Sequence, residues 1–264
     1  MEIFWAVLWF AVIGIVLALM LAFAAKKMSV KKDPKAEKIR EALPGANCGG
    51  CGYAGCDAYA EAVAKGEAAI GACKSCDQAA LDAISAVMGA ASQKAVRYRA
   101  QVMCCGTVDV AKKKYVYEGA MDCIAAAKLG GGNKTCPNGC LGFGTCVAHC
   151  SQNAIEVVNG VARVNYELCI GCGKCATACP KNLIKLIPYD AKYWVGCRSV
   201  DKGAVTKSYC GVGCISCRLC EKNCPEGAIT VNDLVASIDY DKCIGCGLCA
   251  SKCPRGIIKS FENY

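Results

Sequence analysis

The residues of this chain that could do chemistry are its cysteines, 26 among 264 residues. Three runs have the spacing C-x2-C-x2-C-x3-C-P, in which three close thiolates hold one [4Fe–4S] cluster and the fourth reaches a neighbouring cluster. Zinc sites instead use isolated C-x2-C pairs separated by a loop, so structural zinc is disfavoured. The runs are Cys169, Cys172, Cys175, Cys179 and Pro180; Cys214, Cys217, Cys220, Cys224 and Pro225; and Cys243, Cys246, Cys249, Cys253 and Pro254.

These runs belong to a unit that is written twice without a gap. Adding 74 to each cysteine number in the first copy gives a cysteine in the second, from the Cys123–Cys197 pair to the Cys179–Cys253 pair. The chain therefore contains a tandem duplication of one cysteine-rich module. We expect each copy to fold as a bacterial two-cluster ferredoxin.

The second copy has a complete ligand set for two clusters. Cross-ligation between the runs predicts the following assignment. One cluster is held by Cys214, Cys217, Cys220 and Cys253, and the other by Cys243, Cys246, Cys249 and Cys224.

The first copy lacks one ligand, because Phe143 stands where the second copy has Cys217. Cys136, four residues before Cys140, is predicted to replace it. The predicted sets are then Cys136, Cys140, Cys146 and Cys179 for one cluster, and Cys169, Cys172, Cys175 and Cys150 for the other.

A fifth cluster is predicted nearer the N-terminus, in a glycine-rich loop. Its ligands are Cys48, Cys51, Cys56 and Cys73, with the spacing C-x2-C-x4-C-x16-C. Asp57 is expected to cap a helix over residues 57–65 that brings the chain back toward Cys73. Cys76 is interpreted as a residue outside this ligand set that could substitute for one of its members.

Five further cysteines lie outside these sets: Cys104, Cys105, Cys123, Cys197 and Cys210. Small buried thiols are common in protein cores, so packing alone could explain them. The alternative is a sixth iron–sulfur site, with Cys104 acting beside Cys123 or Cys197 beside Cys210.

The elements that must position these cysteines indicate an α+β fold. Helices are expected at residues 57–65 and 80–91, and a strand at 96–102. Hairpins are expected around Asn159-Gly160 and around Asn232-Asp233. The predicted organisation is a transmembrane anchor at 1–25, a charged linker at 26–43, an N-terminal [4Fe–4S] domain at 44–92, a connecting segment at 93–122, and ferredoxin-like modules at 123–190 and 191–264.

The anchor is predicted because Ile3–Ala25 carries no charge and is long enough to cross a bilayer. The positive-inside rule places the N-terminus outside and every cysteine in the cytoplasm, in a single-pass protein of the inner (cytoplasmic) membrane. The basic residues that follow the span are Lys26, Lys27, Lys31, Lys32, Lys35, Lys38 and Arg40.

Composition and missing motifs narrow the function. The formal charge is +9, but five oxidised cubes with their thiolates would add about −10, which leaves little support for binding nucleic acid. The sequence has no phosphate-binding glycine motif and, with His149 as its one histidine, no catalytic triad. We therefore expect electron carriage by the clusters, with no catalytic residues and no bound nicotinamide or flavin.

Two segments carry a family resemblance. The first is Leu43-Pro-Gly-Ala-Asn-Cys48-Gly-Gly-Cys51-Gly-Tyr-Ala-Gly-Cys56 behind the anchor, and the second is Gly131-Gly132-Asn133-Lys134 followed by Cys136, Gly139-Cys140-Leu141-Gly142 and Cys146. With the two modules, they resemble the B subunit of the Rnf-type ion-translocating electron transport complex, a ferredoxin:NAD⁺ oxidoreductase, in its long polyferredoxin form.

The resemblance implies an electron-transfer subunit. It would receive electrons from soluble ferredoxin and pass them to membrane subunits, then to a flavoprotein subunit and NAD⁺, with Na⁺ or H⁺ translocated. The alternative is a membrane-anchored polyferredoxin that serves a cytoplasmic hydrogenase or a heterodisulfide-reductase-type enzyme.

Overall fold

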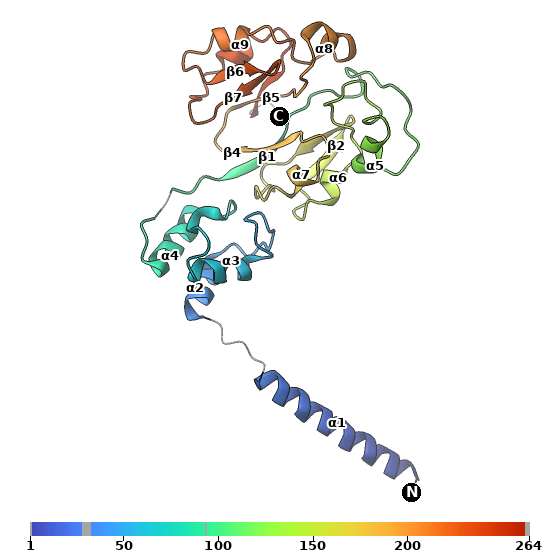
Figure 1. Ribbon diagram of the computed structural model, residues 1–264, viewed down its shortest axis with the longest axis vertical. Helices are drawn as coiled ribbons and strands as arrows, with labels where there is room; N and C mark the ends of the chain where they lie inside the picture. The colour runs from blue at the N-terminus through green and yellow to red at the C-terminus, as the bar shows by residue number, and fades with distance from the viewer. Residues whose placement is uncertain (1, 28–32, 93, 262–264) are drawn as a thin grey trace.

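The computed structural model describes residues 2–27, 33–92 and 94–261. Its parts follow one another in chain order: a long helix, a small helical unit, and two modules of short helices and hairpins (Figure 1). The described strands form two-stranded antiparallel sheets, so the fold is mixed, as the α+β prediction requires.

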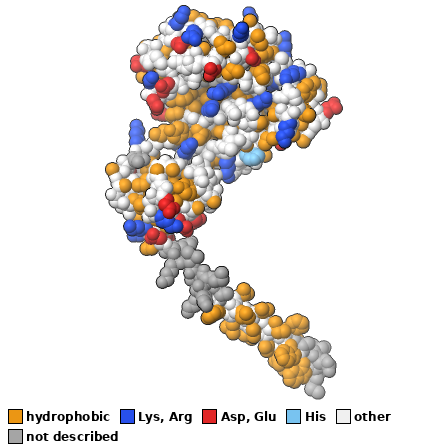
Figure 2. All heavy atoms as spheres, viewed as in Figure 1, with side chains coloured by type: hydrophobic (Ala, Val, Ile, Leu, Met, Phe, Trp, Pro, Cys, Tyr) orange, Lys and Arg blue, Asp and Glu red, His pale blue; other side chains and the backbone are white. Residues whose placement is uncertain are grey.

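The first helix, α1 (Glu2–Lys27), stands apart from the rest of the chain (Figure 1). Its described large apolar side chains, from Phe4 to Phe23, are exposed, and they cover the visible face of the helix (Figure 2). No helix within the described residues combines the length and the apolar character that crossing a membrane requires. The span predicted at Ile3–Ala25 is therefore not shown by the structure, and residues 28–32 of the predicted linker lie outside the described residues.

The helical unit is built from α2 (Pro34–Ala42), α3 (Cys56–Ala64), the 3-10 turn η1 (Ile70–Ala72) and α4 (Gln78–Met88). Two aspartates begin its helices: Asp33 accepts a hydrogen bond from the Lys35 N–H of α2, and Asp77 accepts one from the Ala80 N–H of α4. The core of the unit consists of Ile39, Tyr59, Val63, Leu81 and Ile84.

Asp57 does not have the capping role that the sequence predicts. Helix α3 begins one residue earlier, at Cys56, and its N-cap, Gly55, makes no side-chain hydrogen bond. The Asp57 carboxylate instead pairs with the Arg40 guanidinium of α2 at 3.1 Å. The loop before α3 is held by Asn47, whose side-chain oxygen accepts the Cys56 N–H at 2.9 Å.

Module 1 contains two antiparallel pairs and three short helices. The elements are β1 (Tyr98–Val102) with β4 (Ile184–Pro188), β2 (Ile155–Val158) with β3 (Val161–Val164), α5 (Cys123–Lys128), α6 (Thr145–Ala148) and α7 (Lys174–Ala178). The predicted strand at 96–102 is confirmed as β1. Because β1 pairs with β4, part of the predicted connecting segment completes the sheet of this module.

Module 2 repeats this plan. Its elements are β5 (Tyr193–Val195) with β8 (Ile258–Ser260), β6 (Ile229–Asn232) with β7 (Val235–Ile238), α8 (Gly203–Tyr209), α9 (Leu219–Lys222) and α10 (Leu248–Ser251). The apolar core of each module includes cysteines as well as aliphatic residues. The thiols of these core cysteines, such as Cys146, Cys175 and Cys220, are therefore positioned by the packing of the core.

The two hairpin turns occupy equivalent positions of the repeat. Asn159 and Gly160 have φ values of 49° and 73°, the left-handed conformation of a type I′ turn. In module 2 the turn lies at Asp233-Leu234, with φ values of 47° and 65°, and not at Asn232-Asp233 as predicted. Asn232 pairs with Val235 at the end of β6, so an aspartate and a leucine adopt the conformation that asparagine and glycine favour in module 1.

Candidate iron–sulfur sites

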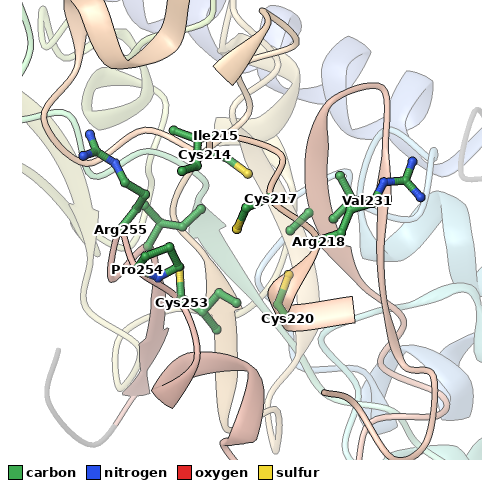
Figure 3. A pocket seen from close by; sticks show the side chains of 12 residues that line it. Cys214, Ile215, Cys217, Arg218, Cys220, Val231, Cys253, Pro254 and Arg255 are labelled. Atoms are coloured by element: carbon green, nitrogen blue, oxygen red, sulfur yellow. The ribbon is translucent and has the colours of Figure 1, made fainter. Parts of the chain in front are cut away.

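Four cysteines of module 2 surround one cavity, which we call the Cys214 pocket. Cys214, Cys217, Cys220 and Cys253 line it together with apolar side chains such as Val231 and Ile257. Their side chains project into the same space from separate segments (Figure 3). Cys220 is carried by the helical turn α9, and Cys253 follows α10. These four are the residues that the sequence predicts for one cluster.

The Cys243 pocket is the second cavity of module 2. It is lined by Cys224, Cys243, Cys246 and Cys249, again with apolar neighbours that include Ile229 and Ile238. The structure thus brings Cys224 of the earlier run to the three close cysteines of the later run. That exchange is the arrangement that cross-ligation requires.

In module 1 the equivalent Cys140 pocket differs from the prediction at one residue. Cys140, Cys146 and Cys179 line it as expected, and the fourth thiol is that of Cys123. Burial raises the pKa of Cys146 to about 12, and the charges of Cys140, Cys123 and Cys179 act in the same direction. Cys123 is held there because its N–H donates to the Thr145 hydroxyl at 2.7 Å. Cys136, which was predicted for this set, lines a different cavity.

The other set of module 1 combines three residues of the later run with Cys150. Burial raises the pKa of Cys175 to about 12, and the charges of Cys169, Cys172 and Cys150 act in the same direction. The Cys169 sulfur accepts the Ala100 N–H of β1 at 3.4 Å, and the Cys150 sulfur accepts the Ala154 N–H at 3.3 Å. Backbone donors of this kind stabilise thiolate ligands and tune the potential of a bound cluster.

Four of the five N-terminal cysteines gather around the core of the helical unit, and Cys48 is half-buried outside it. Cys56 and Cys76 are buried in that core, and Cys51 and Cys73 pack against it. A hydrogen bond from the Cys76 thiol lowers the pKa of Cys73 to about 6, whereas the same contact and burial raise the pKa of Cys76. The thiolate form is therefore favoured at Cys73, the residue of this pair that the sequence predicts as a ligand.

The N-terminal loop also packs against module 1. A Cβ added to Gly50 would lie 2.4 Å from the Cys172 carbonyl oxygen, so only glycine allows this approach. Beside it, the Ser75 hydroxyl donates to the Ile170 carbonyl at 2.8 Å. The predicted N-terminal cluster site is therefore adjacent to the Cys169–Cys175 site.

The pockets fit iron–sulfur cubes by donor type and surroundings. Each offers four thiols at separate positions on an apolar wall, which matches a cube with an iron atom at each thiolate. Across the described residues, no three histidine, cysteine, aspartate or glutamate side chains converge on a point that a single metal ion could occupy.

Known protein families match three parts of the chain. Residues 43–75 match a putative Fe–S cluster family, residues 162–185 a 4Fe–4S binding domain, and residues 213–257 a 4Fe–4S dicluster domain. The first match contains Cys48, Cys51, Cys56 and Cys73 and ends before Cys76.

Three relatives match most of the chain. The B subunit of the Na⁺-translocating ferredoxin:NAD⁺ oxidoreductase complex of Acetobacterium woodii is 43% identical over 88% of this chain and 70% of its own length. The B subunit of an ion-translocating oxidoreductase complex of Methanosarcina acetivorans is 40% identical over 87% of this chain and 88% of its own length. The B subunit of the proton-translocating ferredoxin:NAD⁺ oxidoreductase complex of Clostridium ljungdahlii is 39% identical over 86% of this chain and 81% of its own length.

The chain belongs to the family of B subunits of ion-translocating oxidoreductase complexes. As a member of that family, it is an electron-transfer component of an oxidoreductase, and the other subunits of the complex are its partners. The family resemblance drawn from the cysteine motifs is thereby confirmed. The family matches support 4Fe–4S domains in this chain.

The sequence predicts Cys136 beside the Cys140 set because Cys136 lies four residues before Cys140, whereas Cys123 is the thiol that lines the Cys140 pocket. The loss of a cysteine at Phe143 was visible, but which residue fills the place depends on how α5 folds back onto Thr145. No spacing rule contains that information.

Proposed function

We propose that this chain accepts electrons from reduced ferredoxin and relays them through five or more [4Fe–4S] clusters to membrane and flavoprotein subunits. The coupled reactions are NAD⁺ reduction and translocation of Na⁺ or H⁺. The observation that carries the proposal is the set of four-thiol pockets in a chain that is 39–43% identical to B subunits of translocating complexes. When bound, the clusters supply one-electron redox chemistry at very negative potentials, down to about −700 mV.

The order of the sites suggests a direction. The N-terminal site lies against module 1 through Gly50 and Ser75, and module 1 is followed by module 2. We infer that electrons enter at module 2, cross module 1 and leave through the Cys48–Cys73 site toward the membrane partners.

The repeat itself points to the entry surface. In module 1, the loop around Ile170 and Cys172 is covered by the N-terminal iron–sulfur domain. The equivalent residues of module 2 are Ile244 and Cys246, and both are exposed, Ile244 by 62%. Since this face of the module seats one iron–sulfur domain in copy one, we propose that it seats ferredoxin in copy two.

The proposal includes a membrane anchor at residues 1–25, with the N-terminus outside and the cluster domains in the cytoplasm. Support comes from the uncharged stretch Ile3–Ala25 and the basic residues that follow it. The exposed apolar side chains of α1 also require a nonaqueous environment or a partner to cover them.

An Ile244→Asp variant of the full chain tests the entry surface. A buried charge at the contact should slow reduction by chemically reduced ferredoxin about tenfold, which corresponds to ~1.4 kcal/mol. Because Ile244 also lines the Cys243 pocket, the rates are compared only between preparations whose iron and acid-labile sulfide contents are equal. Stopped-flow absorbance under anaerobic conditions measures the rate.

Val116→Asp is the matched control, because Val116 is an exposed apolar residue on a different loop. It should leave the rate unchanged. Equal rates for wild type and Ile244→Asp would contradict entry at this face. If ferredoxin did not reduce even the wild type, the proposed donor itself would be wrong.

A further inference from the structure

We propose that Cys104, Cys136, Cys197 and Cys210 bind a sixth [4Fe–4S] cluster at the junction of the two modules. These four thiols line one cavity, which we call the junction pocket. It is similar in size to the Cys214, Cys243 and Cys140 pockets. The inference rests on the proposed electron relay and adds a site to it.

The cysteines of the junction pocket come from three parts of the chain that the fold brings together. The segment after β1 runs between the two modules: Lys112 N–H donates to the Tyr209 carbonyl, and Thr135 N–H donates to the Lys112 carbonyl, both at 2.9 Å. On one side this segment holds the loop of Cys136, and on the other the loop of Cys210. Cys136 and Cys210 accordingly pack into the same small apolar cluster.

Glycines leave room around the sulfurs. A Cβ added to Gly106 would lie 3.6 Å from the Cys104 sulfur and 3.7 Å from the Cys210 sulfur, so these two thiols flank one glycine. Gly139 and Gly213, which are equivalent in the repeat, lie beside Cys136 and Cys210 in the same way. Side chains at these positions would project toward the space that a cube needs.

Backbone donors point at two of the four sulfurs. Cys104 accepts the N–H groups of Gly106 at 3.4 Å and Cys140 at 3.5 Å. Cys197 accepts the N–H groups of Ser199 and Cys214, each at 3.4 Å. Such N–H···S bonds favour a thiolate bound to iron, and they are of the kind made to Cys150, Cys169 and Cys224 at the ferredoxin-type sites.

The charges around the pocket call for an anionic occupant. Lys134 lines the pocket and is 2% exposed, and its ammonium donates to the carbonyls of Gly106 and Gly160. None of the ion pairs found among the described residues involves Lys134. Arg198 also lines the pocket, and Arg255, which lines the neighbouring Cys214 pocket, donates to the carbonyls of Gly213 and Cys210. An oxidised cube with four thiolates carries about two negative charges, which would balance these cations.

The position of the site gives it a role. The Cys140 N–H donates to Cys104, and the equivalent Cys214 N–H donates to Cys197. One thiol of the junction pocket is therefore hydrogen-bonded to a cysteine of the Cys140 pocket, and another is hydrogen-bonded to a cysteine of the Cys214 pocket. A cluster here would take one electron from module 2 and pass one electron to module 1.

The assignment uses 24 of the 26 cysteines and leaves Cys76 and Cys105. Native mass spectrometry of the anaerobically prepared full chain should show six clusters, with about 24 iron and 24 sulfide. In a Cys104→Ser/Cys210→Ser variant, iron and sulfide should each fall by about four. Cys105→Ser, at the neighbouring thiol outside the pocket, and Cys76→Ser are the matched controls and should keep the full content.

A wild-type chain with five clusters would overturn the proposal, and so would a double variant that keeps the wild-type iron content. A zinc ion held by these residues would also overturn it. The cluster count from the mass of the wild-type chain tests the proposal even if the variant fails to fold. Because ferredoxin-dependent reduction is measured separately, a missing sixth cluster is distinguishable from a failure of the proposed electron relay.

Discussion

The two modules are copies of one repeated sequence, yet equivalent cysteines line different pockets in the two copies. Cys123 and Cys197 are 74 residues apart and occupy the same place in the repeat. In module 1, Cys123 lines the Cys140 pocket, whereas in module 2, Cys197 lines the junction pocket. Phe143 and Cys217 account for the difference, because module 2 already has its fourth thiol at Cys217.

The comparison teaches that a ligand's role is set by its neighbours as well as by its spacing. Position 143 is a phenylalanine, which packs against Tyr117 at 4.8 Å between ring centroids. Cys123, at the start of the repeat, therefore supplies the fourth thiol of the Cys140 pocket. The equivalent residue of module 2, Cys197, is then available to line the junction pocket. A second difference follows along the chain: the N-terminal domain covers module 1 at Cys172, and the equivalent face of module 2 is open.

The largest expected effect comes from exchanging the ligand that distinguishes the modules. Cys123→Ser should remove the cluster of the Cys140 pocket, with a loss of about four iron, and it should destabilise module 1 because the cube forms part of its core. Adding Phe143→Cys to this variant restores the pattern of module 2 and should recover the iron. Iron analysis and thermal unfolding under anaerobic conditions measure both effects.

Cys197→Ser is the matched variant in module 2. It should also cost about four iron, but from the junction pocket, so the magnetic signals of the Cys214 and Cys243 clusters should persist. If Cys123→Ser kept its iron without Phe143→Cys, the predicted ligand Cys136 would be favoured over Cys123.

The next effect concerns the domain that only module 1 carries. Cys73→Ser should abolish the N-terminal cluster, whereas Cys76→Ser should retain it, because the pKa of Cys73 is lowered to about 6 and the pKa of Cys76 is raised. At neutral pH the thiolate form is thus favoured at Cys73, and the iron content of the two variants measures the difference. Loss of iron in Cys76→Ser with retention in Cys73→Ser would reverse the assignment.

A smaller effect is expected at the contact that covers module 1. Gly50→Val would place a side chain against the Cys172 carbonyl, where even a Cβ lies 2.4 Å away. The loop must move, so electron transfer between the N-terminal site and module 1 should slow while iron content stays the same. Pulse-radiolysis kinetics measure this, and Gly14→Val is the control, because Gly14 has open space around it and an ordinary φ. An unchanged rate in Gly50→Val would separate the contact from the electron path.

The smallest effect is that of the hydrogen bond beside this glycine. Ser75→Ala removes the donor to the Ile170 carbonyl and should cost about 0.5–1.5 kcal/mol of stability. Limited proteolysis between the helical unit and module 1 should become faster. Identical proteolysis of wild type and Ser75→Ala would show that this bond does not hold the two parts together.

The sequence was most informative where ligands recur at fixed spacing. It predicted the membership of the Cys214 and Cys243 pockets residue by residue, and the strand β1 and the first hairpin in nearly correct positions. It misplaced the second turn because Asn232 is the stronger turn residue locally, although the 74-residue repeat points to Asp233-Leu234. The junction pocket could not be derived, because its cysteines are brought together by the segment after β1, through hydrogen bonds between residues far apart in the chain.

The most direct test is the iron and acid-labile sulfide content of the anaerobically purified full chain, read together with its electron paramagnetic resonance after chemical reduction. Bound [4Fe–4S] clusters predict at least about twenty of each atom per chain and reducible spin signals. Abundant zinc without sulfide, and no signal on reduction, would contradict the account.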